Sequence, residues 1–578
     1  MSAHFNIGLL DTIILIAYFA LLVTIGWWAA RRVKKSTADY FLASRSIPWL
    51  VTTASFLATI ISALTFIGTP AEGFGADYRY LFSNVGDILA AFFVATVFLP
   101  VYQRHGVTSI YEFIATRFGP PVRTACAGYF LISRMLASTV RIVAVAKVLE
   151  VVSGGDLSYS WCVLIVVGVI LAYTTVGGGR AIAWTDLLQF ILLISGALVT
   201  MGYLISQIPG GIPKIIEIGK HAVRADGTVY NKFNFLELFK VENLDLFFLF
   251  AIWGFFQSTA AYGTDQDMTQ RLLACNNHKK ARWSLMLSGI VSIPITFLFL
   301  SIGVALYAYS CSHPALIVGM TDNDHVFPRF ILTSMPEGLR GLLLAAVASA
   351  AMGSTDSALA SLATSFVIDF YKPFFGKNAD ETQYVRVSKV SFLVFGLFMV
   401  FLALILRNLD NLLWLGFRIV AFTYGPLLGV FAVAILTNWR ISSKKIIAMM
   451  FGITAILFTF GMAAWWSTTG GATSGFWVDL HKTYWRLYII FGALLVPIGC
   501  FFLREKLSLS FGMALAKTAF RTVWAVAWAV GAIERAVGPL GVRSAVVGLG
   551  RVGVVGPRLG RREGFALRLL DQGVHLLL

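Results

Sequence analysis

The stretch AAVASAAMGSTDSALASLATSFVIDFY, from Ala345 to Tyr371, decides how the rest of this chain is interpreted. It lies within a long apolar run, yet it carries many hydroxyl side chains and the carboxylate of Asp356. On a period of 3.6 residues, one helical face holds Ser354, Ser357, Ser361 and Thr364. Such groups are costly in hydrocarbon unless they pair or hold an ion. The pattern therefore indicates a membrane helix whose oxygens bind a hard cation such as sodium. The alternative is a helix whose hydroxyls bond back to its own carbonyls.

The composition places the whole chain in a membrane. Of its 578 residues, 58% are hydrophobic and 13% are charged, which no soluble globular protein resembles. Apolar runs long enough to span a bilayer recur from end to end. We predict an all-α polytopic membrane protein with about thirteen transmembrane helices. Their approximate limits are 9–30, 47–73, 80–103, 121–152, 158–178, 182–207, 246–270, 281–309, 337–371, 388–407, 411–438, 443–467 and 484–503.

Basic residues predict the orientation of these helices. Arg31 and Arg32 follow the first span, Lys279 and Lys280 follow the seventh, and Arg504 follows the thirteenth. Basic loops stay on the cytoplasmic side, so the alternation predicts that the N-terminus lies outside and the C-terminus in the cytoplasm. We expect the protein to be in the plasma (inner) membrane. It also accounts for the net charge of +17 without nucleic acid as a partner. The first apolar run lacks preceding basic residues and a small-residue cleavage signal, so we expect a retained helix.

Two spans carry polar residues and helix breakers in their middle. The second span holds Thr59, Ser62 and Thr65, with Gly68 and Pro70 following, and it is expected to unwind in mid-membrane. If it does not unwind, it simply ends early at the proline. The seventh span holds Gln257, Ser258 and Thr259. Interrupted helices five spans apart predict an inverted repeat with a binding site between its halves.

Several motifs occur together in family order: ASFLATIISALTFIG at 54–68, GVTSIYEFIATRF at 106–118, WTDLLQ at 184–189, GTDQDMTQRLL at 263–273, and the DFY that ends the stretch quoted first. The chain resembles the sodium:solute symporter family over about residues 5–505. The resemblance implies a leucine-transporter-like fold of five plus five helices in a transporter domain at 1–504, with repeats at about 47–207 and 246–438. It implies sodium-coupled symport of a small organic solute by alternating access, with sodium as the coupling ion. We find no nucleophile–base pair and expect no enzyme.

The family's common sodium site maps onto four residues of this chain. The resemblance implies as ligands the carbonyls of Ala58, Ile61 and Ala350 and the hydroxyl of Ser354. The family often has a second hydroxyl where this chain has Gly353. Some members hold a second sodium, and the matching residues are Asp186, Asp356 and Ser357. Two carboxylates near one cavity repel unless a cation or a proton lies between them. The alternative for Asp186 is an ion pair with Arg180 or a neighbouring helix.

Buried arginines predict the charge of the solute. Arg134 and Arg141 lie in the fourth span and Arg418 lies in the eleventh. A guanidinium in an apolar helix needs a partner, and it fits a carboxylate in a bidentate fashion. Arg134 falls near the arginine that grips the substrate carboxylate in the sialic acid symporters, and Arg418 falls near a polar substrate contact of the sugar symporters. We therefore expect an organic anion. The alternative is that the arginines pair internally with Asp87, Asp186 or Asp356. The polar candidates around the solute are Ser62, Thr65, Asn84, Gln257 and Ser258.

Other functions stay open at this point. A neutral solute such as an amino acid or sugar is one, and a cation such as choline is another, for which Trp253, Phe255 and Phe256 are the candidates for an aromatic cage. A transporter-like sensor is a third, although residues 505–578 contain no recognisable kinase domain. We expect this basic C-terminal extension to form an amphipathic surface helix at 507–537 and then disorder, with a further membrane span as the alternative to that helix. The oligomeric state is left open.

Overall fold

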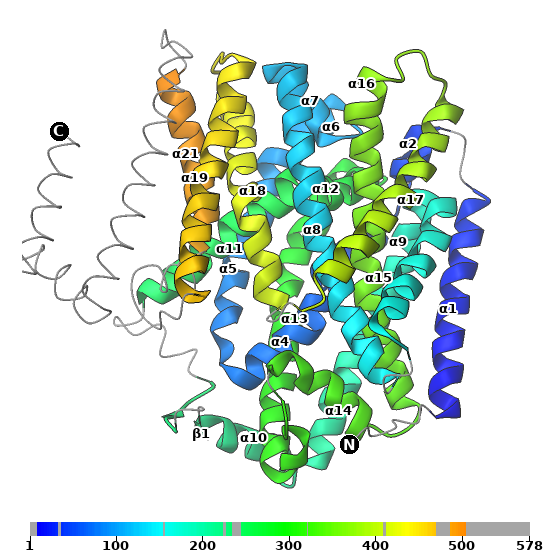
Figure 1. Cartoon of the computed structure of the whole chain (residues 1–578), viewed down its shortest axis with the longest axis vertical. Helices are drawn as coiled ribbons and strands as arrows, with labels where there is room; N and C mark the ends of the chain where they lie inside the picture. The colour runs from blue at the N-terminus through cyan, green and yellow to red at the C-terminus, as the bar shows by residue number, and fades with distance from the viewer. Residues whose placement is uncertain are drawn as a thin grey trace, which may run out of the picture.

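The computed structural model describes residues 8–32, 36–153, 157–223, 227–233, 244–320, 322–408, 412–469 and 486–503. The predictions for 505–578 fall outside these residues. The long helices lie side by side in a bundle (Figure 1). They are α1 (Leu9–Ala30), α3 (Trp49–Ile60), α4 (Ala63–Gly75), α5 (Ser83–Phe93), α8 (Pro120–Val152), α9 (Tyr159–Gln207), α11 (Leu244–Thr264), α13 (His278–Ser312), α15 (Leu339–Ser365), α17 (Glu381–Ile405), α18 (Leu412–Leu436), α19 (Ser443–Thr469) and α21 (Leu487–Leu503).

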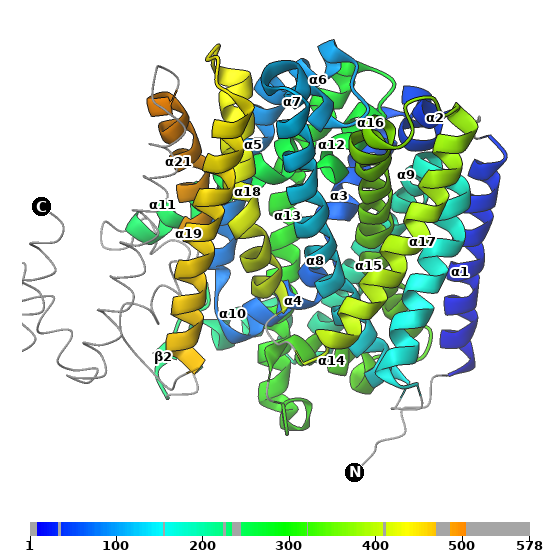
Figure 2. The same cartoon turned by 45° about the horizontal axis from the view of Figure 1, so that its top comes forward.

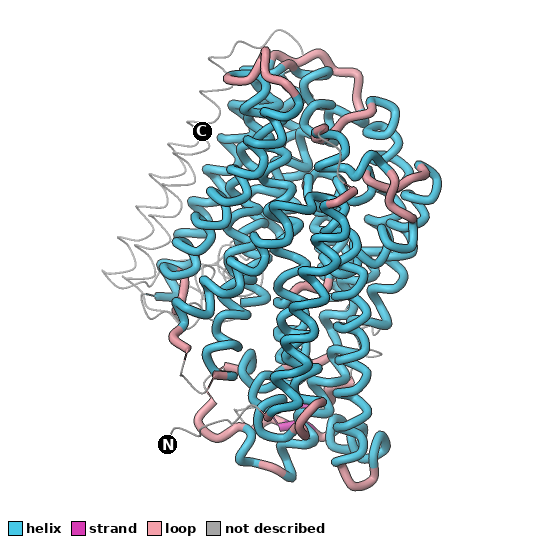
Figure 3. Tube along the Cα trace, turned by 90° about the vertical axis from the view of Figure 1, so that its right-hand side faces the viewer, coloured by secondary structure: helices cyan, strands magenta, loops and turns pink. Residues whose placement is uncertain are grey.

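Short elements cover the two ends of the bundle (Figures 1 and 2). One end carries α2 (Thr37–Leu42), α6 (Leu99–His105), α7 (Ile110–Phe118), α12 (Gln266–Leu273) and α16 (Lys372–Phe374). The other carries α10 (Gly211–Lys220), α14 (Val326–Ser334) and an antiparallel hairpin of β1 (Ala222–Val223) and β2 (Val229–Tyr230). Figure 3 shows that the rest of the described chain is almost entirely helical.

The prediction of thirteen spans is not confirmed as a count. Within the described residues, nine helices are long and apolar enough to cross a membrane, or ten if the bent pair α3 and α4 is one span. Part of the difference arises in α9, a single helix of 49 residues that covers two predicted spans. Its backbone is broken at Gly178, where φ is +55° and ψ is −155°. The shorter α21 and the helix α11 are not among the nine.

The predicted break in the second span is confirmed. Helix α3 ends at Ile60 and α4 begins at Ala63, with a bend of 53° between them. The amide of Ser62 donates to the carbonyl of Ile60 at 3.0 Å, so the helical bond to the Ala58 carbonyl is not made. Pro70 lies inside α4 and does not end the span. The seventh span breaks at its end, at Asp265, which caps the short helix α12.

Helix α15, which contains the stretch quoted first, lies at the centre of the bundle. It packs against α9, α8 and α1 and against both halves of the broken span, α3 and α4. Its side chains are buried along nearly its whole length. Ser361 and Thr364 donate to the carbonyls of Ala358 and Ala360, at 2.9 and 2.7 Å. For these two hydroxyls the structure matches the alternative, in which they bond back to their own helix.

Candidate functional site

A polar cavity of about 150 Å³ lies beside the break between α3 and α4. Its walls come from α3, α4, α5, α8, α11, α12, α13 and α18. Six of the seven predicted substrate contacts line it: Ser62, Thr65, Asn84, Arg134, Gln257 and Ser258. The seventh, Arg418, is not among the lining residues, although its neighbours Phe417 and Val420 are. The sequence does not show which face of α18 is turned toward the cavity, so the contact at Arg418 stays a prediction.

Arg134 belongs to an ion-pair network rather than standing alone. Its guanidinium lies 3.3 Å from Asp265 and also donates to Asp267, while the Tyr424 hydroxyl donates to Asp265. Both carboxylates come from the break between α11 and α12. This network ties α8 to α12 and α18. Arg134 therefore pairs internally, as in the alternative given above, but its partners are Asp265 and Asp267 and not the aspartates that we considered.

Arg141, two helical turns further along α8, has no such partner. It lines the same cavity, and its one side-chain hydrogen bond is long, 3.5 Å to the carbonyl of Ser354. Among the described residues no carboxylate pairs with it. A guanidinium that lines a cavity without an ion-pair partner in the described part of the chain is available to a carboxylate from outside the protein.

The other cavity residues hold one another in place. Asn84 donates to the hydroxyls of Ser292 and Thr296 on α13, at 3.0 and 3.2 Å. Ser258 donates to Asp87 on α5, which also lines the cavity. From the sequence we considered Asp87 only as a possible partner of the buried arginines and not as a residue of the substrate site. Its signal was a carboxylate within a predicted span, but the sequence did not indicate which way it faces.

The residues of the predicted sodium site lie on elements that the structure brings together. Ala58 and Ile61 flank the end of α3, where the backbone leaves the helix at Ile61 with ψ of 71°. Ala350 and Ser354 lie one turn apart on α15, which packs against α3. The Ser354 hydroxyl bonds the carbonyls of Ala350 and Ala351, both at 3.2 Å. Helix breaks of this kind expose carbonyl oxygens that can coordinate a cation.

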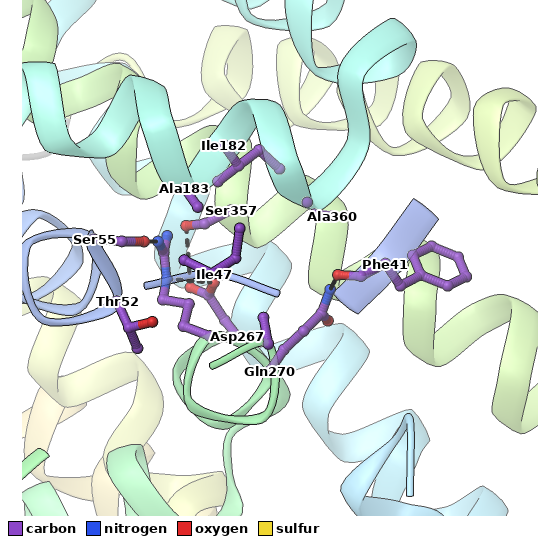
Figure 4. A pocket seen from close by; sticks show the side chains of 13 residues that line it. Phe41, Ile47, Thr52, Ser55, Ile182, Ala183, Asp267, Gln270, Ser357 and Ala360 are labelled. Atoms are coloured by element: carbon purple, nitrogen blue, oxygen red, sulfur yellow. Dashed lines mark hydrogen bonds and ion pairs between the residues drawn. The ribbon is translucent and has the colours of Figure 1, made fainter. Parts of the chain in front are cut away.

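Asp186 lies at a second polar centre between α9, α3 and α12. It accepts hydrogen bonds from Ser55, at 2.6 Å, and from Arg271, whose guanidinium also contacts Ser55. Arg180, the partner we considered, pairs instead with Asp39 at 3.4 Å. A small cavity of about 30 Å³ adjoins this centre, and Figure 4 shows Ser55, Asp267 and Ser357 around it.

Asp356 and Ser357 lie beside this centre on α15. The Asp356 carboxylate accepts hydrogen bonds from the Tyr173 hydroxyl at 2.6 Å and from the amide of Ser357. A Cβ atom on Gly353 would lie 2.5 Å from Gln189 Oε1 and 3.2 Å from Asp186 Oδ1. The end of the Gln189 side chain would therefore have to shift to admit a side chain at this position.

A bundle with broken helices around a mid-membrane polar cavity is the architecture of secondary transporters. A family model described as sodium:solute symporter family matches residues 40–452. The chain belongs to the sodium:solute symporter family, so it is a sodium-coupled transporter and not an enzyme.

Individual relatives agree with this assignment. The sodium/sialic acid symporter NanT of Aliivibrio fischeri is 26% identical over 456 residues, which cover 78% of this chain and 88% of the relative. The sodium-coupled monocarboxylate transporter 2 of Bos taurus is 29% identical, covering 75% of this chain and 70% of the relative. The solved structure of a Na+-coupled sialic acid symporter superposes with a TM-score of 0.73 at 22% identity, covering 87% of this chain and 99% of that one. Together with the helical bundle, this likeness shows a leucine-transporter-like fold.

Proposed function

We propose that this symporter imports a small organic anion whose carboxylate binds the guanidinium of Arg141 in the central cavity. The observation that carries the proposal is that Arg141 lines the cavity without a carboxylate partner among the described residues. Desolvated guanidinium groups bind carboxylates strongly and in a fixed geometry. Relatives named for sialic acid and for monocarboxylates support the same class of solute.

The remaining cavity residues contact the rest of the solute. These are Ser62, Thr65, Asn84, Gln257 and Ser258. Arg134 lines this wall with its guanidinium paired to Asp265 and Asp267, and its role as a direct contact stays a prediction. The same holds for Arg418, which lies outside the cavity wall. The repeat limits and the outside location of the N-terminus are likewise part of the proposal.

The coupling sodium is proposed to bind the carbonyls of Ala58, Ile61 and Ala350 and the hydroxyl of Ser354. The unmade helical bond at Ala58 supports this assignment. A second cation is proposed at Asp186, Asp356 and Ser357. One oxygen of Asp186 is buried without a hydrogen-bond partner in the described part of the chain, which supports a cation there. Its other oxygen is already held by Arg271.

Uptake into proteoliposomes tests the proposal. A labelled panel of short monocarboxylates, sialic acid, proline, galactose and choline is offered with and without a sodium gradient. We expect sodium-driven uptake of an acid in the wild type. Arg141→Gln is expected to raise its KM by about tenfold to a hundredfold, because a charge-assisted pair is lost.

Arg134→Gln and Arg418→Gln are the matched comparisons. Arg418→Gln tests the predicted contact at that residue: a KM for the acid within about threefold of wild type would remove Arg418 from the substrate site. Uptake of a neutral or cationic solute that survives Arg141→Gln would contradict the proposal. Ser354→Ala separates the ion from the solute, because it should raise the sodium concentration needed for half-maximal uptake.

A further inference from the structure

Asp87 is a half-buried carboxylate that the transport mechanism described so far does not use. It lies on α5 and lines the same cavity as Arg141. Its side chain accepts one hydrogen bond, from Ser258 on α11. In the described part of the chain no arginine, lysine or histidine pairs with it. The cavity therefore exposes one carboxylate and one guanidinium that do not satisfy each other.

The wall that carries Asp87 is built to hold it in place. Helices α5 and α11 touch backbone to backbone: a Cβ atom on Gly86 would lie 2.1 Å from the Ala251 carbonyl oxygen, and one on Gly254 would lie 2.2 Å from that of Ser83. The residue next to Gly86 is Asp87, so its position along the wall is fixed. Arg141 comes from α8, a different wall of the cavity.

A purely structural role does not explain the charge of Asp87. The amide oxygen of an asparagine would accept the same hydrogen bond from Ser258. A carboxylate adds a desolvation cost at this depth unless a donor or a cation meets it. Ser258 satisfies one of about four lone-pair sites. The remaining ones are available to a group that enters the cavity.

We propose that Asp87 is a second anchor of the substrate site, which accepts hydrogen bonds from a hydroxyl or ammonium group of a solute whose carboxylate lies on Arg141. This inference rests on the proposed function. It narrows the carboxylate-bearing solutes to those with a second, donor group: hydroxy acids, which are anions, or amino acids, which would replace the anion with a zwitterion. Plain alkanoates leave Asp87 without a donor, and dicarboxylates place a second negative charge near it, so both bind more weakly.

Two matched series of acids test this with the full-length chain in detergent and sodium. Hexanoate, 6-hydroxyhexanoate, 6-aminohexanoate and adipate share a six-carbon chain; propionate, lactate and alanine share a three-carbon chain. Binding is measured as the ligand concentration that half-saturates the rise in melting temperature. In at least one series we expect the hydroxy or the amino acid to bind about tenfold or more tightly than the plain acid. Which of the two binds better distinguishes an anionic from a zwitterionic solute.

Asp87→Asn is expected to reduce this preference to about threefold or less, because the amide retains an acceptor but loses the charge. Val85→Ala is the control on the same helix, since Val85 is 37% exposed and points away from the cavity; it should keep the preference. Equal binding of all acids in the wild type would overturn the inference, and this arm needs no variant. An unchanged preference in Asp87→Asn, or a change in its sodium requirement alone, would also overturn it.

Failure of the carboxylate assignment gives a different result. Alcohols or amines without a carboxyl group, such as hexanol and hexylamine, would then bind as well as the acids. Asp87 would still be supported in that case if Asp87→Asn weakened their binding. If acids bind regardless of their second group, the proposed function stands and the role of Asp87 falls.

Discussion

At the scale of single residues, the pair of Asp186 and Arg271 offers a direct test of the buried network. Removing one partner of a buried ion pair costs about 3–5 kcal/mol, because the other charge is left behind. We expect Asp186→Asn and Arg271→Gln each to lower the melting temperature of the purified protein. The double variant should be more stable than the sum of the two losses predicts.

Arg180 supplies the matched control for this cycle. It pairs with Asp39 and not with Asp186. The losses caused by Arg180→Gln and Asp186→Asn should therefore add to within about 0.5 kcal/mol. Additivity in the Arg271 cycle as well would show that the contact between Asp186 and Arg271 contributes nothing to stability.

Gly353 carries a second residue-scale prediction. A serine here would push its Cβ against Gln189 Oε1 at 2.5 Å, so Gly353→Ser should lower both melting temperature and uptake. Shortening the neighbour in Gly353→Ser/Gln189→Ala should recover part of the loss. Gly168→Ala, where a Cβ meets nothing within 4 Å, is the control. Gly353→Ser with normal stability and uptake would contradict the crowding.

Residue identity alone could predict which side chains are unusual, but not how they pair. Arg134 stood out in sequence because it is charged within an apolar span, and the structure does place it on the cavity. Its partners Asp265 and Asp267 lie over 130 positions away, and only the tertiary fold of the bundle brings them together. Arg141 looked equivalent in sequence, and the absence of such a partner in the described residues now distinguishes it.

At the scale of elements, Lys232 caps the C-terminal end of helix α4. Its buried ammonium donates to the carbonyls of Gly73, Phe74 and Ala76, at 3.2, 2.6 and 3.0 Å, where α4 ends. A cation at a helix C-terminus satisfies orphan carbonyls and complements the helix dipole. We expect Lys232→Met to lower the melting temperature by several degrees and to slow uptake, because α4 is one half of the broken span.

Lys214→Met is the control for the loss of a lysine in the same region. The Lys214 side chain is 43% exposed and, within the described residues, forms an ion pair with Glu217 along α10, an interaction worth little. Equal melting temperatures for the two variants would show that the cap does not stabilise α4. The sequence could not predict this contact, since Lys232 lies between the predicted spans 182–207 and 246–270 and nothing in the sequence shows where that connection packs.

Hydrophobicity predicted where helices lie better than it predicted how many cross the membrane. The break in the second span followed from Gly, Pro and hydroxyl residues, although the backbone leaves the helix at Ile61, before Gly68. Helix α9 runs through the backbone break at Gly178 without a gap. It therefore counts as one membrane-crossing helix, although the hydropathy pattern predicted two spans in the same stretch. Glycine permits that local conformation, and periodicity does not reveal it.

At the scale of the whole molecule, the predicted orientation can be tested on a single helix. Helix α13 has Lys279 and Lys280 near its start and Cys311 near its end, and its 35 residues extend about 50 Å. Cys311 is the one exposed cysteine of the five, all of which lie in the described residues. The positive-inside rule places the lysine end in the cytoplasm. A membrane-impermeant maleimide should therefore label Cys311 in intact cells.

The opposite end of α13 provides the control for this labelling. In a Cys311→Ser background, Lys279→Cys should react only after the membrane is permeabilised. The predicted orientation would be wrong if Lys279→Cys were labelled in intact cells while Cys311 of the wild-type protein was not. The direction of transport would be reassigned with it, because the cavity, the broken span and the network around Arg271 keep fixed positions relative to α13 within one packed bundle.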